Sequence, residues 1–451
     1  MSRSTMLAVA TAVAFALPVA PAFAQAELKL LSHAYQQPNN ALGADHPQLS
    51  ADGNWAIFSS GASGFVAPGG DGFFGHDVFV YDIACRRTEL VSTTWDGQPP
   101  NGASGGSNGR SALSGDGRYA AFISEADNLD QANDSGDIAH NVSDLYLVDR
   151  QVAVGHPARV RWVTKPRANG TGGTSGYPSF SADGRYLAFE SNARNLVPHA
   201  ASITNVYVYD IQLDQMVLVS RDRNRNPVIA QYPRISADGR HVVFRSSAAD
   251  MVADPEVPAG TSHVYLRDLR AGTNQLIDRS NSGAVADMGV GDDYFSLSGD
   301  GRFVAFRSAA PNLTGNTATL LTQQVFVRDT HNLTLSMITR NPNNAPAPHS
   351  SRWPALSDDG RYLAYSSPAP GPSVWGGIYR RELGNGATKL LSPHRITGAP
   401  EDGTFTAISA DGLRVAFLSG SGNLIAGVSG FGVYLSDARP SAPPSACSKA
   451  R

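Results

Sequence analysis

The chain has 451 residues, and its 36 lysines and arginines against 39 aspartates and glutamates give a formal net charge of −3 at pH 7. The basic residues are mostly scattered arginines, which argues against nucleic acid and against an anionic membrane surface as the main partner. The 45 glycines and 28 prolines are spread through recurring loops, so they mark no linker between domains.

The first 24 residues have the pattern of a secretory signal peptide. Arg3 supplies a positive start, residues 6–19 are an apolar run, and Ala22-Phe23-Ala24 is a small-x-small cleavage site. The apolar run is too short for a membrane-spanning helix. We therefore expect cleavage near Ala24 and a mature chain that is periplasmic or secreted, with no membrane insertion.

One motif, Ser-x-Asp-Gly followed by an apolar run, recurs seven times at intervals of roughly 60 residues, which is the signature of a stacked supersecondary unit. The third copy predicts four short strands, over residues 178–182, 186–191, 206–210 and 216–220. The second of these is apolar at every position from Tyr186 to Phe189, which suits a sheet that is covered on both faces.

The number and order of the strands predict a closed ring. The strand type that ends each repeat occurs first at residues 28–32, before every other strand, and no copy follows Asp437. The simplest arrangement pairs this N-terminal strand with the last repeat. We therefore predict an all-β fold, a seven-bladed β-propeller of four-stranded antiparallel blades over residues 25–440, closed by the N-terminal strand and followed by a tail over 441–451.

The run Ser181-Ala182-Asp183-Gly184-Arg185-Tyr186-Leu187-Ala188-Phe189, followed by Val206-Tyr207-Val208-Tyr209-Asp210, resembles the TolB-type WD40-like propeller repeat. The resemblance covers essentially the whole mature chain and implies the propeller fold. TolB itself carries an additional N-terminal α/β domain and has a six-bladed propeller. This chain has no room for that domain, and its seven repeats make one blade more than TolB has. A role like that of TolB in the Tol–Pal envelope system is therefore only one of three functional readings.

The Asp-Gly pairs are interpreted as tight turns between the first two strands of each blade. Glycine accepts the positive φ of such a turn, and the aspartate can accept hydrogen bonds from nearby backbone amides. Calcium ligation by the seven carboxylates is the alternative. The aspartates are Asp52, Asp116, Asp183, Asp238, Asp300, Asp359 and Asp411.

The two cysteines, Cys85 and Cys447, suit an oxidising compartment. Cys85 lies in a turn of the first predicted blade and Cys447 in the tail behind the last blade, and these blades are neighbours in a closed ring. We predict a disulfide between them, with two free thiols as the alternative.

Candidate binding residues lie where the first strand of each blade begins, on the ring face with the long loops. Six residues before each turn aspartate the chain has His46, Arg110, Tyr177, Tyr232, Tyr294, Trp353 and Phe405. One interpretation is an amphipathic funnel for sugar rings or peptide side chains. The other is that the aromatic rings separate adjacent blades and have no ligand.

Three further arginines, Arg234, Arg245 and Arg307, lie close to this position in neighbouring blades, together with Glu190. Planar guanidinium groups match the geometry of a carboxylate, so this sector is a candidate site for a carboxylate or an acidic sugar. Salt bridges between blades are the alternative.

A calcium site is considered at one acidic loop, which contains Asp127, Asp130, Asp134, Asp137 and Asp144. A solvated acidic loop is the other interpretation. No cofactor motif is present, neither a P-loop nor a dinucleotide-binding fingerprint.

The leading hypothesis for function is an exported, non-catalytic, monomeric propeller that binds a protein or a glycan through its long-loop face. The alternative is an enzyme at the channel, a polysaccharide (uronate) lyase or a lactonase-like hydrolase, in which an arginine neutralises the uronate carboxylate and a base removes the adjacent proton.

Overall fold

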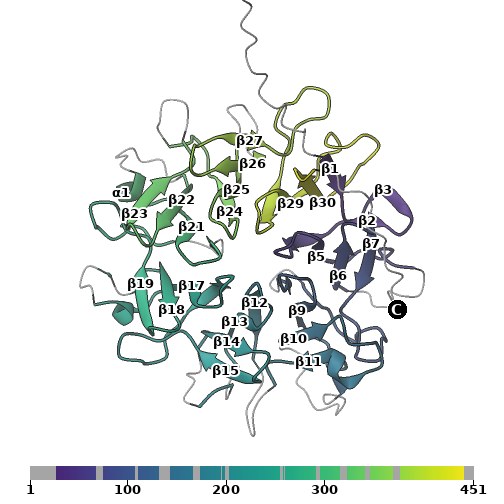
Figure 1. Ribbon diagram of the computed structural model, residues 1–451, viewed down its shortest axis with the longest axis horizontal. Coiled ribbons are helices and arrows are strands. Elements are labelled where there is room, and N and C mark those ends of the chain that lie inside the picture. The colour runs from purple at the N-terminus through teal and green to yellow at the C-terminus, as the bar shows by residue number, and fades with distance from the viewer. Residues whose placement is uncertain are drawn as a thin grey trace, which may run out of the picture.

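The computed structural model describes residues 27–67, 75–106, 110–131, 143–165, 173–193, 196–198, 203–253, 257–258, 260–290, 295–314, 322–340, 346–368 and 376–440. These residues form seven four-stranded antiparallel sheets that are arranged as blades around a central axis (Figure 1). The predicted seven-bladed propeller is therefore confirmed. The signal peptide and the tail over 441–451 lie outside the described residues and remain predictions.

The first four blades follow one another along the chain. Blade 1 consists of β4 (Asp45–Leu49), β5 (Trp55–Ser60), β6 (Asp77–Asp82) and β7 (Arg87–Leu90). Blade 2 consists of β8 (Ala112–Leu113), β9 (Tyr119–Ser124), β10 (Asp144–Asp149) and β11 (Val160–Trp162). Blade 3 consists of β12 (Ser175–Phe180), β13 (Tyr186–Ser191), β14 (Asn205–Asp210) and β15 (Gln215–Leu218). Blade 4 consists of β16 (Gln231–Ile235), β17 (His241–Ser246), β18 (His263–Asp268) and β19 (Thr273–Leu276).

The remaining three blades complete the ring. Blade 5 consists of β20 (Ser296–Leu297), β21 (Phe303–Ser308), β22 (Gln324–Asp329) and β23 (Thr334–Met337). Blade 6 consists of β24 (Arg352–Leu356), β25 (Tyr362–Ser367), β26 (Gly377–Glu382) and β27 (Thr388–Leu390). Blade 7 consists of β28 (Thr404–Ile408), β29 (Arg414–Ser419), β30 (Gly432–Asp437) and the N-terminal β1 (Glu27–Leu30).

Few elements lie outside the blades. A hairpin of β2 (His33–Ala34) and β3 (Gln37–Ala41) follows β1. The helical elements among the described residues are α1 (Pro311–Thr314) and the 3₁₀ turns Pro157–Arg159 and Ala249–Met251. None of the helices in the described part of the chain has the length and hydropathy needed to cross a membrane.

The hydrophobic core lies between neighbouring blades. Leu187 and Phe189 of β13 are fully buried and belong to one cluster with Leu145 and Leu147 of blade 2. The middle strands are therefore apolar on both faces, because each face packs against a different blade.

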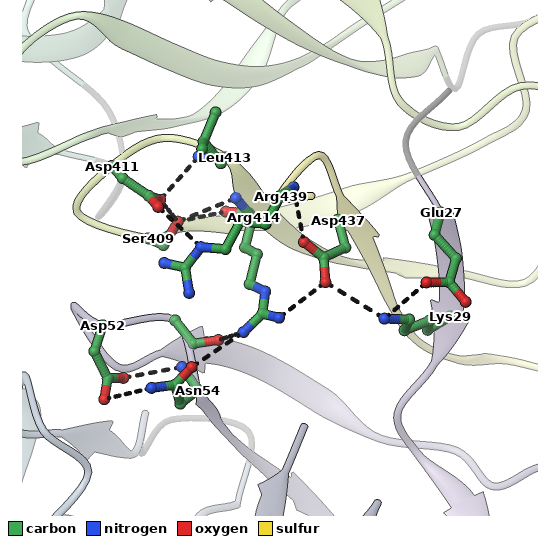
Figure 2. A network of polar contacts seen from close by, with 11 residues as sticks. Glu27, Lys29, Asp52, Asn54, Ser409, Asp411, Leu413, Arg414, Asp437 and Arg439 are labelled. Atoms are coloured by element: carbon green, nitrogen blue, oxygen red, sulfur yellow. Dashed lines mark hydrogen bonds and ion pairs between the residues drawn. The ribbon is translucent and has the colours of Figure 1, made fainter. Parts of the chain in front are cut away.

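The N-terminal strand closes the ring, as the strand count predicts. β1 lies beside β30 in blade 7 (Figure 1). The two strands pair in antiparallel register, with Glu27 opposite Asp437. Figure 2 shows the polar network at this closure, in which Arg414 donates to Asp437 Oδ2 at 2.9 Å and to the carbonyl oxygen of Gly53 at 2.7 Å. Because Gly53 belongs to blade 1, this one side chain connects the last blade to the first.

The seven Asp-Gly turns have one geometry. In each turn the serine hydroxyl donates to Oδ1 of the aspartate over 2.5–2.7 Å, and the same oxygen accepts the amide two residues further on. The turn glycines have φ between +66° and +72°. Each turn aspartate thus stabilises its own hairpin.

Candidate functional site

The first strand of a blade contains a β-bulge at the position where the sequence places its candidate residues. In blade 1, Asp45 pairs with Ser59 and Gln48 pairs with Ile57, so two residues of β4, His46 and Pro47, face one residue of β5. The same register shift occurs in blades 3, 4, 6 and 7. Bulges redirect side chains, and here they do so near the channel axis.

The first bulge residue adopts a left-handed backbone conformation in all five of these blades. The φ angles are +49° at His46, +55° at Tyr177, +59° at Tyr232, +52° at Trp353 and +50° at Phe405. Non-glycine residues rarely adopt this conformation, so the surrounding structure must hold it. In blade 4 a side chain from blade 3 helps to hold this conformation, because Glu190 accepts a 2.6 Å hydrogen bond from the backbone amide of Tyr232.

The side chains at this position contact one another from blade to blade. The ring of Phe405 lies 4.5 Å from that of His46 and 5.1 Å from that of Trp353, centroid to centroid. On another arc the rings of Tyr177 and Tyr232 are 4.7 Å apart, and the Arg110 guanidinium lies 5.5 Å from the Tyr177 ring. The aromatic residues therefore do pack between blades, and Tyr294, the remaining member of the set, lies outside the described residues.

A cavity of about 220 Å³ opens inside this belt of side chains. His46, Arg110, Arg234, Trp353 and Phe405 all line it, although they come from five different blades. The structure thus brings two of the predicted arginines, the histidine and two aromatic rings to one cavity on the channel axis. Two guanidinium groups beside aromatic surface can bind a carboxylate whose remaining atoms are apolar.

Two predicted arginines are placed elsewhere. Arg245 lies on β17 opposite Gln231, donates to its Oε1 at 2.7 Å and lies 4.7 Å from the centre of the Tyr232 ring. Arg307 is buried at the end of β21. Neither is among the described residues that line the cavity.

A second cavity of about 140 Å³ lies deeper in the channel, where the Ser-x-Asp-Gly turns of the blades meet. The residues at position x of the turns form a collar, and six of them are small: Ala51, Gly115, Ala182, Ala237, Gly299 and Ala410. The seventh residue of the collar is Asp358, which lines both cavities. The sequence carries a signal for it, since Asp358 is the one residue at position x of the seven turns that is neither alanine nor glycine.

The collar is tight because backbone hydrogen bonds join its members. Six bonds of 2.8–3.1 Å run between neighbouring turns, among them Gly299 N to Asp358 O and Asp358 N to Ala410 O. A Cβ atom added to Gly299 would lie 3.0 Å from the Cβ atoms of both Ala237 and Asp358. A side chain at Gly299 would therefore crowd both neighbouring turns, and Asp358 is the one collar residue with a side chain larger than a methyl group.

Burial raises the pKa of Asp358 above its ordinary value, and the neighbouring charge of Asp359 raises it further. Within the described part of the chain, the Asp358 carboxylate makes no hydrogen bond or ion pair. A half-buried carboxylate without such a partner is unfavourable when it is ionised.

The acidic loop of blade 2 is described only in part, because Asp134 and Asp137 lie outside the described residues. Asp130 accepts a 3.0 Å hydrogen bond from the amide of Trp162, and Asp144 accepts a 2.8 Å bond from the Thr164 hydroxyl. Asp127 bonds to the side chain of Asn101. The described residues contain no group of three or more histidine, cysteine or acidic side chains arranged for a metal. Calcium binding at this loop stays the alternative to a solvated acidic loop, since two of its aspartates lie outside the described residues.

Cys85 lies in the turn between β6 and β7, as expected. Its predicted partner, Cys447, lies outside the described residues, so the disulfide also remains a prediction.

No protein-family model matches the chain, and no curated protein matches it in sequence. Among solved structures, it is similar to an oligogalacturonate lyase from Vibrio parahaemolyticus, with a TM-score of 0.51 and 12% identity over 92% of this chain and 94% of the other. TolB from Acinetobacter baumannii has a TM-score of 0.40 and 14% identity, over 86% of this chain and 78% of that one. The propeller domain of the Trilobed protease from Pyrococcus furiosus has a TM-score of 0.49 and 8% identity, over 88% and 98%. At these identities the similarity concerns the propeller fold.

Proposed function

We propose that the chain is an exported, periplasmic or secreted, binding protein without catalytic activity, which holds a carboxylate group of a protein or glycan partner at the mouth of its central channel. The observation that carries this proposal is the cavity of about 220 Å³ that Arg110 of blade 2 and Arg234 of blade 4 both line. Trp353 and Phe405 line the same cavity and offer apolar surface to the rest of the ligand. A rigid ring that presents such a site on its axis is well suited to binding.

The test is a binding measurement by isothermal titration calorimetry with two probes, trigalacturonate and a peptide of three glutamates. We expect saturable binding of at least one probe to the mature protein. Arg234→Gln should weaken it by about tenfold or more, because a hydrogen bond to a charged group contributes about 1.5–3 kcal/mol.

The matched control is Arg302→Gln, which removes an arginine that pairs with Asp329 away from the channel lining. It should bind the probe as the unchanged protein does. Failure of both probes to bind, or equal binding by the Arg234→Gln variant, would contradict the proposal.

A second candidate function is a uronate lyase, and the observation that favours it is the presence of His46 in the same cavity as the two arginines. Elimination from a uronate requires a base for the proton next to the carboxylate and a positive group that stabilises the resulting charge. The readout is the ultraviolet absorbance of the unsaturated product from polygalacturonate. Turnover that is lost in His46→Ala would replace the binding proposal with this one.

A further inference from the structure

The collar of the channel contains one charge, and that charge stands where the other six blades have alanine or glycine. Asp358 lines the second cavity, whose described lining is otherwise uncharged. The fold does not need a carboxylate at this position, since Ala51 and Ala410 occupy it in other blades and make the same kind of backbone bond between turns.

The carboxylate also lacks the usual compensation for burial. Among the described residues no arginine, lysine or hydroxyl group is bonded to it, whereas the neighbouring Asp359 accepts a 2.5 Å hydrogen bond from Ser357 and a 2.9 Å bond from the amide of Arg361. An ionised carboxylate in such a position destabilises the protein unless a ligand supplies the missing partner.

We propose that Asp358 binds a cationic group of the channel's ligand, an ammonium or guanidinium group that enters the narrow part of the channel while a carboxylate is held by Arg110 and Arg234. The ligand class is therefore a dipolar segment with both charges, such as a peptide with a basic and an acidic group. A uronate glycan, which carries only negative charge, does not supply the cation.

The dimensions of the channel agree with such a ligand. Asp358 lines both cavities, so it lies where they meet and faces a ligand in either. The second cavity, about 140 Å³, has room for an ammonium or guanidinium group.

This inference rests on the proposed anion site, and three small probes test the anion site and the cation site separately. Hexanoate carries the carboxylate alone, hexylamine carries the ammonium alone, and 6-aminohexanoate carries both charges on the same chain. Binding of each is measured by isothermal titration calorimetry to the mature protein and to the variants Asp358→Asn, Asp358→Ala and Arg234→Gln. Asp287→Ala, which removes an exposed carboxylate outside the cavity lining, is the matched control.

We expect 6-aminohexanoate to bind about tenfold or more tightly than either single-charge probe, because the second contact becomes intramolecular. Asp358→Asn and Asp358→Ala should reduce its affinity to that of hexanoate and abolish hexylamine binding, whereas Asp287→Ala should change neither. The alanine variant should fold, since four other blades carry alanine at this position.

Two results would overturn the inference. If hexanoate binds through Arg234 but hexylamine and 6-aminohexanoate show no dependence on Asp358, the anion site stands and the cation site fails. If calcium chloride, titrated as a fourth probe, binds through Asp358 more tightly than hexylamine does, the site is one for a metal cation. Hexylamine binding through Asp358 without any hexanoate binding would instead overturn the proposed anion site.

Discussion

Lys29 and Asp437 are 408 residues apart in the chain, yet the ammonium of Lys29 lies 3.4 Å from Oδ2 of Asp437. The same oxygen accepts the bond from Arg414, so the pairing of β1 with β30 is supported by a polar network as well as by backbone bonds (Figure 2). The two ends of the propeller thus stabilise one blade together.

The first prediction concerns this closure. Arg414→Ala should lower the free energy of unfolding by about 1.5–3 kcal/mol, since it removes charge-assisted hydrogen bonds from a largely buried guanidinium. The control is Arg223→Ala, whose exposed 3.3 Å ion pair with Asp250 should contribute less than about 1 kcal/mol. Urea unfolding measures both. Equal losses would show that the network has no special role in closing the ring.

The second prediction concerns the tail. If Cys85 and Cys447 are joined, reduction of protein exported by its host should lower the melting temperature, because the crosslink restricts the unfolded chain. Cys447→Ser should reproduce the loss without reductant. Mass spectrometry that finds both thiols free in the exported protein would contradict the predicted disulfide.

The third prediction concerns pH. The hydrogen bond from Arg240 lowers the pKa of Asp268 from 3.8 to about 2. Because the pKa is lower in the folded protein, this pair stabilises the fold above pH 3.8, and the stabilisation is lost as the pH falls from 3.8 through 2. Unfolding free energies of the protein and of Asp268→Asn should therefore differ at pH 5 and converge near pH 2. A constant difference would contradict the assignment. The effect should be modest, since Arg240 is half exposed.

The fourth prediction concerns metal content. The described aspartates of the blade 2 loop bond to amide, hydroxyl and side-chain amide groups of the protein. We therefore expect EDTA to leave the melting temperature unchanged, and elemental analysis of the mature protein to find no stoichiometric calcium. A bound calcium ion whose removal lowers the melting temperature, and which is lost in Asp130→Asn but kept in Asp358→Asn, would contradict this expectation and support the calcium site at Asp130, Asp134 and Asp137.

Much of the architecture was predictable because each repeat carries its own turn and strand signals. The pairing of β1 with β30 was predictable because the strand type that ends each repeat occurs once before the first repeat and is absent after the last one. By contrast, no local signal marks the left-handed conformation of Tyr177 or Trp353, because tertiary packing imposes it against the preference of the residue.

The grouping of the candidate residues around one cavity was predicted in part. Equal spacing before each turn aspartate located His46, Arg110, Trp353 and Phe405, which do line one cavity. Arg245 was expected near the same ligand, but its guanidinium lies against the Tyr232 ring. Strand pairing places Arg245 opposite Gln231, the residue that precedes the bulge. Asp358 was not predicted as a candidate. It stands out only by comparison with the other six blades, which have alanine or glycine at the same position.

The central claim is that Arg110 and Arg234 hold a carboxylate at the channel mouth, and the most direct test is the hexanoate binding isotherm of the double variant Arg110→Gln/Arg234→Gln. We predict saturable binding to the unchanged protein and to Arg302→Gln, and none to the double variant. An isotherm that is the same for all three proteins, or no binding to any of them, would contradict the account.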